Sequence, residues 1–436
     1  MPPEKRYSGK LSLLVIVAAL GYFVDIYDLL LFGIVRVDSL IGIGVTEVAD
    51  QTRYGTLLLN WQMGGMLIGG IFWGMVGDKK GRLAVLFGSI ILYSLANLAN
   101  GTLEMVSKEA GTETTIWIYA VLRLIAGFGL AGELGAGITL VSESMSKENR
   151  GWGTMIVATV GVFGAVVAAL VAGQVHWTIS YYIGGSMGLL LLLLRIGVYE
   201  SGLFMNVKQS HVSKGNFFQL FKSWKAFAKY FSIIFIAVPV WYVMSIYILL
   251  SDNMGRAMGM APDQIPVPGK SIMFAYIGIT IGDVASGLIS QLLKSRKKTL
   301  LIFLLLTIVS LVMYYTIGSR SQFAFYAVAT FVGFATGYWA VFITTAAESF
   351  GTNIRATVTT TAPNFVRGAV IPMTLLFGMF KGFYFDAGEK PGQHVINAAI
   401  SVGVIVMILA FVSWYNLKET FGKDLDYTEG AENQLP

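Results

Sequence analysis

Long apolar stretches recur along the chain, and each is bounded by charged or turn-forming residues. Twelve such stretches cover residues 11–35, 55–76, 83–100, 116–142, 152–173, 177–196, 228–250, 271–293, 299–318, 322–347, 356–380 and 395–415. A helix needs roughly 20 apolar residues to cross a bilayer core about 30 Å thick. The pattern therefore predicts an all-α integral membrane protein with twelve transmembrane helices.

The composition agrees with this prediction. Of 436 residues, 55% are hydrophobic and only 13% are charged, whereas a globular domain carries about 25% charged residues. Charges this scarce cannot cover a soluble protein of this length. Residues 1–10 lead into the first apolar stretch without a small-residue cleavage site, so we expect this stretch to be retained as a helix.

Cysteine and histidine are too scarce for most site chemistry. The chain has no cysteine, which excludes disulfides and thiolate ligands, and its three histidines are scattered at His176, His211 and His394. A membrane enzyme would need clustered His or Asp for metal or acyl chemistry. We therefore expect no metal, no cofactor and no enzymatic activity.

Lys and Arg are spread unevenly over the loops between the predicted helices. If the amino terminus is cytoplasmic, that side carries twenty of the 31 basic residues and the other side eight, with Arg123, Arg195 and Arg367 inside spans. Cytoplasmic loops characteristically hold such an excess. We predict a multi-pass protein of the plasma membrane with both termini cytoplasmic, and the basic balance requires no nucleic acid.

A polar stretch over 199–227 separates two sets of six helices, 1–198 and 228–416, and a tail follows over 417–436. Both sets carry the same mark: Arg150 follows Glu143 by seven residues, and Arg355 follows Glu348 by seven. Transporters are often built from such repeats, so we predict two pseudo-symmetric six-helix bundles. The alternative is that charges simply crowd every cytoplasmic end of a membrane helix.

Residues 74–82, after the second stretch, read GMVGDKKGR. This loop resembles the signature of the major facilitator superfamily, which implies that family's fold and a charged gate at the cytoplasmic helix ends. The implied gate residues are Asp78, Arg82, Glu143 and Arg150 in the first half and Glu348 and Arg355 in the second. Such a network can hold two half-bundles together in one state and release them in the other. Topogenic charge alone would explain the lysines, but neither the Asp nor the glycines.

Three further segments resemble the metabolite:proton symporters of this superfamily, with the sugar porters and phosphate:proton symporters as close cousins. They are residues 21–33 (GYFVDIYDLLLFG), 123–136 (RLIAGFGLAGELGA) and 347–356 (AESFGTNIRA). Asp25 stands where these symporters usually have Glu, and Leu134 stands where an aromatic residue is usual. These departures leave the substrate open.

Charged residues inside the predicted spans are candidates for proton coupling, because deep charge is costly and usually faces a partner or a wet cavity. Asp25 and Arg123 both fall about 21 Å from the cytoplasmic side, with Asp28 about one turn beyond. We expect Asp25 or Asp28 to carry the proton and Arg123 to set its acidity. The alternative is a structural ion pair. Glu133 could relay the proton inward or could stabilise a helix contact.

In the second half, Asp283 and Arg367 fall near the membrane midplane, where transporters bind substrate. Arg367 is a planar cation suited to a carboxylate or phosphate. Asp283 is either a resting partner that an anionic substrate displaces or a permanent partner. Further substrate-binding candidates are the polar or aromatic residues Tyr22, Gln62, Trp241, Tyr242, Tyr338, Trp339 and Asn364.

Taken together, these features predict a secondary active transporter, a proton-coupled symporter of a small organic solute. An organic acid is favoured because each half contains a buried arginine. A sugar or polyol stays open as the substrate. A zwitterionic or cationic osmolyte also stays open, since the spans contain four deep acidic residues but only two deep arginines. The expected partners are the small-molecule substrate, the proton and the lipid bilayer, and we expect a monomer.

Overall fold

The computed structural model describes residues 4–144, 150–200, 217–351, 354–390 and 392–423, and every regular element in these ranges is helical. The first half holds α1 (Glu4–Gly42), α2 (Val48–Lys80), α3 (Arg82–Asn100), α4 (Leu103–Ala110), α5 (Thr112–Leu130), α6 (Glu133–Ser144), α7 (Arg150–Val162), α8 (Gly164–Ala172) and α9 (Trp177–Glu200). After the 3-10 turn η1 (Phe217–Phe221), the second half holds α10 (Trp224–Tyr242), the π-helix η2 (Val243–Ile248), α11 (Ser251–Ala257), the 3-10 turn η3 (Pro262–Gln264), α12 (Pro268–Leu292), α13 (Arg296–Thr316), the 3-10 turn η4 (Gly318–Arg320), α14 (Gln322–Thr336), α15 (Trp339–Ser349), α16 (Arg355–Gly368), α17 (Val370–Asp386) and α18 (Gln393–Asn416).

Each predicted span coincides with one helix or with consecutive helices. Ten runs in the described chain are long and apolar enough to cross a membrane, or eleven if the bent pair Ala84–Asn100 and Leu103–Ala110 is one span. α2 is continuous over the predicted span 55–76 but is not among these runs. The chain is thus an all-helical protein with ten or eleven candidate spans, and the count of twelve stays a prediction.

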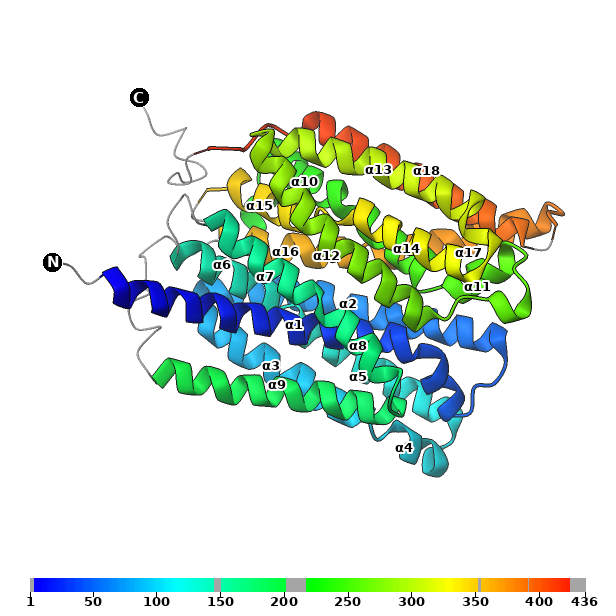
Figure 1. The fold of residues 1–436 in the computed structure, drawn as a ribbon. Helices are drawn as coiled ribbons and strands as arrows, with labels where there is room; N and C mark the ends of the chain where they lie inside the picture. Colours follow the sequence, from blue (N-terminus) through cyan, green and yellow to red (C-terminus); the bar gives the residue numbers. More distant parts are fainter. Residues whose placement is uncertain (1–3, 145–149, 201–216, 352–353, 391, 424–436) are drawn as a thin grey trace.

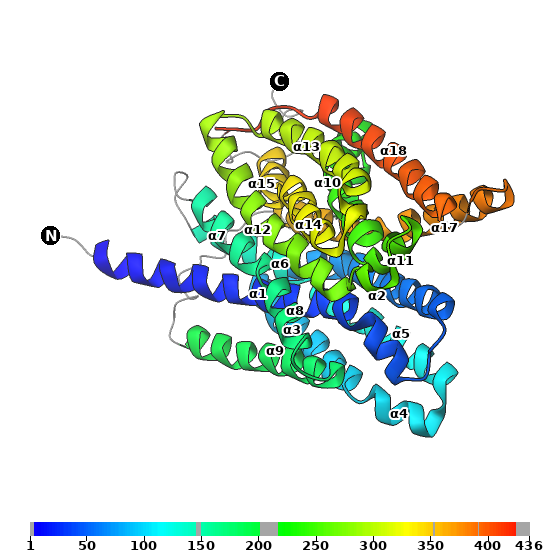
Figure 2. The ribbon, with the colours of Figure 1, turned by 45° about the vertical axis from the view of Figure 1, so that its right-hand side comes forward.

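The helices run side by side, and α1 begins at the end of the bundle where α18 finishes (Figure 1). We call this the terminal end and the opposite one the far end. Helices of the first half lie below those of the second in Figure 1, and the same division is visible after a 45° turn (Figure 2). The halves meet where α2 packs on α16 and where α12 packs on α7 and α8.

Equivalent glycine contacts recur in the two halves. On α2, Gly65 lies directly against the Leu124 carbonyl of α5, and on α12, Gly278 lies against the Thr330 carbonyl of α14. Neither position leaves space for a Cβ. Small residues allow membrane helices to approach this closely, and the recurrence supports an internal structural repeat.

Both halves also contain an interrupted helix. The span formed by α5 and α6 breaks at Ala131 and Gly132, and the span formed by α14 and α15 breaks at Gly337 and Tyr338. A break frees backbone N–H and C=O groups that must find other partners inside the bundle. The two breaks therefore place hydrogen-bonding groups in the protein interior, where the candidate site is found.

Candidate functional site

Arg367 of α16 is the centre of the candidate site. Its side chain is only 1% exposed, and its guanidinium carbon lies 5.7 Å from the centre of the Trp339 ring and 6.0 Å from that of Trp241. Such distances allow cation–π attraction. Within the described residues, Arg367 forms neither a hydrogen bond nor an ion pair, so its positive charge has no bonded anion.

The residues around Arg367 come from both halves. Tyr22 and Asp25 of α1 lie within electrostatic range of Arg367, as does Tyr276 of α12, and Tyr22 also lies beside Trp339. Tyr22 and Asp25 are buried. Five sequence candidates (Tyr22, Trp241, Asp283, Trp339 and Arg367) are thereby gathered in one interior region, while Tyr276 was missed because tyrosine is common in membrane helices.

Asp283 does not form the expected ion pair with Arg367. Its Oδ1 accepts a hydrogen bond of 3.1 Å from the backbone N–H of Ala340, and its Oδ2 has no partner in the described chain. The carboxylate thus caps the first turn of α15, where free N–H groups and the helix dipole both attract an anion. Close contact of Gly282 with Gly337 brings Asp283 to this position.

Arg123 does not contact either aspartate of α1 directly. Its Nη2 donates a hydrogen bond of 2.7 Å to Oδ1 of Asn97 on α3, and its guanidinium lies over the rings of Tyr181, Tyr119 and Phe32. Asp28 is fully buried and lies within electrostatic range of Arg123. The sequence placed Asp25 at the depth of Arg123, but the aspartate near Arg123 in the structure is Asp28, one turn beyond, and no direct bond joins the two.

Glu133, at the start of α6, pairs with Arg195 of α9. Two contacts join the side chains, one of 3.0 Å between Nη1 and Oε2 and a closer one between Nη2 and Oε1. The pair lies against the backbone of α1 at Gly21, which has no room for a side chain. Arg195 was visible in the sequence as an arginine inside a span, but nothing there indicated its partner.

Asp25 lies one helical turn beyond Gly21 and has no hydrogen-bond partner among the described residues. The charges that act on it are Arg367 in the second half and Glu133, Asp28 and Arg195 in the first. Asp25 therefore stands between the Arg367 site and the ionic groups of the first half.

The four remaining substrate candidates use their polar groups to bind backbone carbonyls. Gln62 donates to Leu29 O at 3.0 Å, Tyr242 to Ala399 O at 2.6 Å, Tyr338 to Ile236 O at 3.0 Å, and Asn364 to Ala131 O at 2.8 Å. The Asn364 bond crosses between the halves and satisfies a carbonyl at the break between α5 and α6. These hydrogen bonds join the helices to one another, so the four residues act first as structural contacts.

Only part of the predicted gate can be placed. The side chains of Asp78, Arg82, Glu143 and Arg150 lie outside the described part of the structure. Glu348 accepts hydrogen bonds from Arg296, with a closest distance of 3.2 Å, and Arg355 donates to Ala347 O at 2.9 Å.

The tail after α18 joins this terminal-end cluster through Glu419. Its carboxylate accepts hydrogen bonds from Ser295 Oγ and from the backbone N–H of Arg296 at 2.9 Å. Burial raises the pKa of Glu419, but hydrogen bonds from Ser295 and from the backbone N–H groups of Phe421, Arg296 and Thr420 outweigh burial and leave the pKa below its ordinary value.

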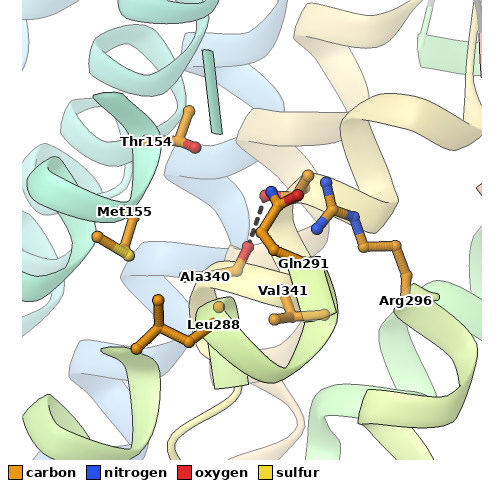
Figure 3. Close-up of a pocket in the computed structure, with 9 residues that line it drawn as sticks. Thr154, Met155, Leu288, Gln291, Arg296, Ala340 and Val341 are labelled. Atoms are coloured by element: carbon orange, nitrogen blue, oxygen red, sulfur yellow. Dashed lines mark hydrogen bonds between the residues drawn. The ribbon is translucent and has the colours of Figure 1, made fainter. Parts of the chain in front are cut away.

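A cavity lies between the halves on the terminal side of the site (Figure 3). Its lining includes Thr154 and Met155 of α7, Leu288 and Gln291 of α12, and Ala340 and Val341 of α15. Ala340 is also the residue whose N–H binds Asp283. The cavity therefore ends beside the capped start of α15.

At the far end the halves are tied by an ion pair that the sequence did not indicate. Arg36 of α1 binds Asp252 of α11 at 2.8 Å, and only 3% and 11% of the two side chains are exposed. Arg256 contacts the same carboxylate at 3.2 Å, and Thr52 donates to Asn253 at 3.3 Å across the same boundary. Arg36 follows directly after the apolar stretch 11–35, where a basic residue is expected in a loop, and the sequence gives no sign of a partner on α11.

These features define a membrane transporter, and comparison with known proteins identifies its family. The family model of the Major Facilitator Superfamily matches residues 11–371, so this chain belongs to that superfamily. It is a transporter of this type and not an enzyme.

Individual proteins agree with this assignment. A Haemophilus influenzae protein named as a metabolite transport protein is 26% identical over 68% of this chain and 71% of its own length. The 3-(3-hydroxy-phenyl)propionate transporter of Escherichia coli is 26% identical over 85% of this chain and 87% of its own. The structure of a proton:xylose symporter superposes with a TM-score of 0.70 at 15% identity, over 96% of this chain and 98% of that one, which shows a shared fold.

Proposed function

We propose that this chain is a proton-coupled symporter of a small organic acid that works by alternating access. The observation that carries the proposal is Arg367, buried between Trp241 and Trp339 with no bonded anion among the described residues. A buried cation without a counterion is costly. A substrate carboxylate would remove this cost, and the guanidinium fork matches carboxylate geometry.

Asp25 supplies the link to the proton. Its carboxylate lies within electrostatic range of Arg367, so an anionic substrate and an ionised Asp25 repel each other there. Protonation of Asp25 removes that repulsion, so proton and anion each strengthen the binding of the other. Asp28, near Arg123, could hold the proton at another stage of the cycle.

Movement between access states requires the halves to separate first at one end and then at the other. The buried pair of Arg36 and Asp252 closes the far end here, and its opening would expose the site from that side. We assign residues 1–198 and 228–416 to the two moving bundles. We also propose twelve spans, a plasma-membrane location with the terminal end cytoplasmic, and a functional monomer.

A zwitterion is the second candidate. Asp25 has no hydrogen-bond partner within the described chain and lies in the range of Arg367, so one molecule could place a carboxylate at Arg367 and a cationic group at Asp25. A sugar or polyol would leave the charge of Arg367 unbalanced. The Escherichia coli relative named for an aromatic carboxylic acid supports an organic anion over both.

A thermal-shift screen of the purified protein tests the substrate class, since a ligand that binds the folded state raises its stability. The panel contains 3-(3-hydroxyphenyl)propionate, benzoate, citrate, inorganic phosphate, xylose and glycine betaine. We expect a carboxylate to raise the melting temperature of the wild type and to have no effect on Arg367→Gln. Stabilisation by xylose alone, equal in both proteins, would contradict the proposal.

A further inference from the structure

Asn97 of α3 lies between two charged groups of the first half that do not contact each other. Its Oδ1 accepts the hydrogen bond of 2.7 Å from Arg123, and its side chain lies within interaction range of Asp28 of α1. All three side chains are fully buried. Asn97 therefore links α3 to α5 by a hydrogen bond and lies near Asp28 of α1 without a bond to it.

Asn97 and Asp28 use only part of their capacity for hydrogen bonds. In the described structure the Nδ2 of Asn97 and both carboxylate oxygens of Asp28 have no hydrogen-bond partner. Buried polar atoms are normally paired, and those left unpaired are costly. An amide that holds Arg123 through its oxygen still has both N–H donors free within the described chain.

The surroundings fix the other two members. The Arg123 guanidinium carbon lies 5.0 Å from the centre of the Tyr181 ring and 5.8 Å from that of Tyr119, and the two tyrosine hydroxyls are 2.7 Å apart. The Asp28 carboxylate rests against α9 at Gly184, where a Cβ would collide with Oδ1. With both charges held, the amide of Asn97 is the adjustable element between them.

We infer that Asn97 is a positioning residue for proton coupling, which holds Arg123 through its amide oxygen and presents its amide N–H to the Asp28 carboxylate. The inference rests on the proposed function, in which Asp28 exchanges a proton. An ionised Asp28 accepts from the amide, and a protonated one no longer requires it. Asn97 thus favours release of the proton and keeps the positive charge of Arg123 nearby.

Other groups also face Asp28 and must be counted. Asp25 and Tyr27 act from α1, Tyr93 from α3, and Tyr181 from α9. Arg123 is the cation that acts on Asp28 from α5. The other helices that pack on α1 add no charged group that acts on Asp28 in the described chain; these are α2, α6, α7, α8 and α12. Among the described residues near Asp28, Asn97 is the one that also accepts a hydrogen bond from Arg123.

Asn100, one turn further along α3, provides a matched control. It is also fully buried, but its Nδ2 donates to Ala96 O at 2.7 Å, which is a local bond within the helix. Replacement of either residue by Leu removes an amide of similar volume from the same helix. Only the Asn97 change should alter the titration of Asp28.

Infrared titration of the purified protein in lipid vesicles tests this without a substrate. The band of a protonated carboxylic acid is assigned to Asp28 by its loss in Asp28→Asn. We expect Asn97→Leu to raise the midpoint of this band by about one to two pH units, Asn97→Gln to restore part of the shift, and Asn100→Leu to cause none. If Asn97→Leu does not fold, Asn97→Ser replaces it.

An unchanged midpoint in a folded Asn97 variant overturns the inference, as does the absence of any band lost in Asp28→Asn. The proposed function fails differently: it is contradicted by proton-independent uptake in wild-type proteoliposomes, whatever the titration shows. The infrared result therefore reports on Asn97, and the uptake result reports on symport.

Discussion

The guanidinium carbon of Arg367 lies 5.7 Å from the centre of the Trp339 ring. Trp339 is the first residue of α15, immediately after the break at Gly337 and Tyr338, and Asp283 caps the same turn. The indole beside the proposed anion site is thus held by an interrupted helix. Movement at this break would move one wall of the site.

Loss of the Trp339 ring should weaken anion binding. Trp339→Leu removes the nearer of the two cation–π partners of Arg367, and we expect the dissociation constant for the carboxylate that stabilises the wild type to rise by about 2- to 30-fold. Trp339→Phe retains a ring, so its dissociation constant should rise less. Equilibrium binding to the purified protein measures both, and equal affinities in wild type and Trp339→Leu would contradict the role of the ring.

The glycine contact between α12 and α14 should be intolerant of any side chain. Gly278→Ala places a Cβ against the Thr330 carbonyl, and we expect a loss of about 1–3 kcal/mol in the free energy of unfolding, seen as a lower melting temperature. Gly378→Ala in α17 is the control, because no atom lies within 4 Å of its added Cβ. A Gly278→Ala protein as stable as this control would show that the helices can separate at no cost.

Neutralisation of Asp252 should open the far end. Asp252→Asn leaves Arg36 buried without its counterion, which destabilises the closed state. Because the chain has no cysteine, Thr52→Cys gives a single reporter at this boundary. We expect a membrane-impermeant maleimide to label it faster by at least about tenfold in Asp252→Asn.

The control for this experiment is Arg256→Gln, since Arg256 contacts the same carboxylate but is 43% exposed. Exposed pairs contribute little, so its labelling rate should stay near that of the reporter alone. Equal rates in the Asp252 and Arg256 variants would show that the Arg36 pair does not close the far end.

Glu419 should stabilise the terminal end in a pH-dependent way. Its pKa in the folded protein is below the ordinary value of 4.5, so its contribution is present above that pH and is lost as the pH falls through the folded pKa. Glu419→Gln should therefore melt at a lower temperature than wild type at neutral pH. The difference in melting temperature between the two proteins should disappear in acid. A difference that persists unchanged at low pH would contradict a stabilising role for the ionised Glu419 carboxylate.

The sequence predicted features that depend on a single segment of the chain. Apolar runs predicted helices because any helix in a bilayer must satisfy its own backbone. Helix rise put Arg367 and Asp283 near the midplane, and this depth stays a prediction. Partners could not be predicted in this way. Glu133 is 62 residues from Arg195, and Arg36 is 216 from Asp252, so both pairs depend on how distant helices pack.

The position of Asp283 illustrates the same limit. Depth placed it near Arg367, but the nearest strong donor is a backbone N–H group freed by a helix break that has no clear mark in the sequence. Asn97 was not among the candidates, although the amides Gln62 and Asn364 were, because nothing in an apolar run shows which amide lies beside a charge. Its importance follows only from its neighbours Arg123 and Asp28.

Substrate-driven proton movement in proteoliposomes tests the central claim most directly. With the carboxylate that stabilises the wild type as substrate, an imposed inward proton gradient should drive its accumulation, and substrate entry should carry protons inward. We expect Arg367→Gln to abolish both, and Arg367→Lys to retain weak transport because it keeps the charge but loses the planar fork. Undiminished proton-coupled uptake by Arg367→Gln would contradict the account.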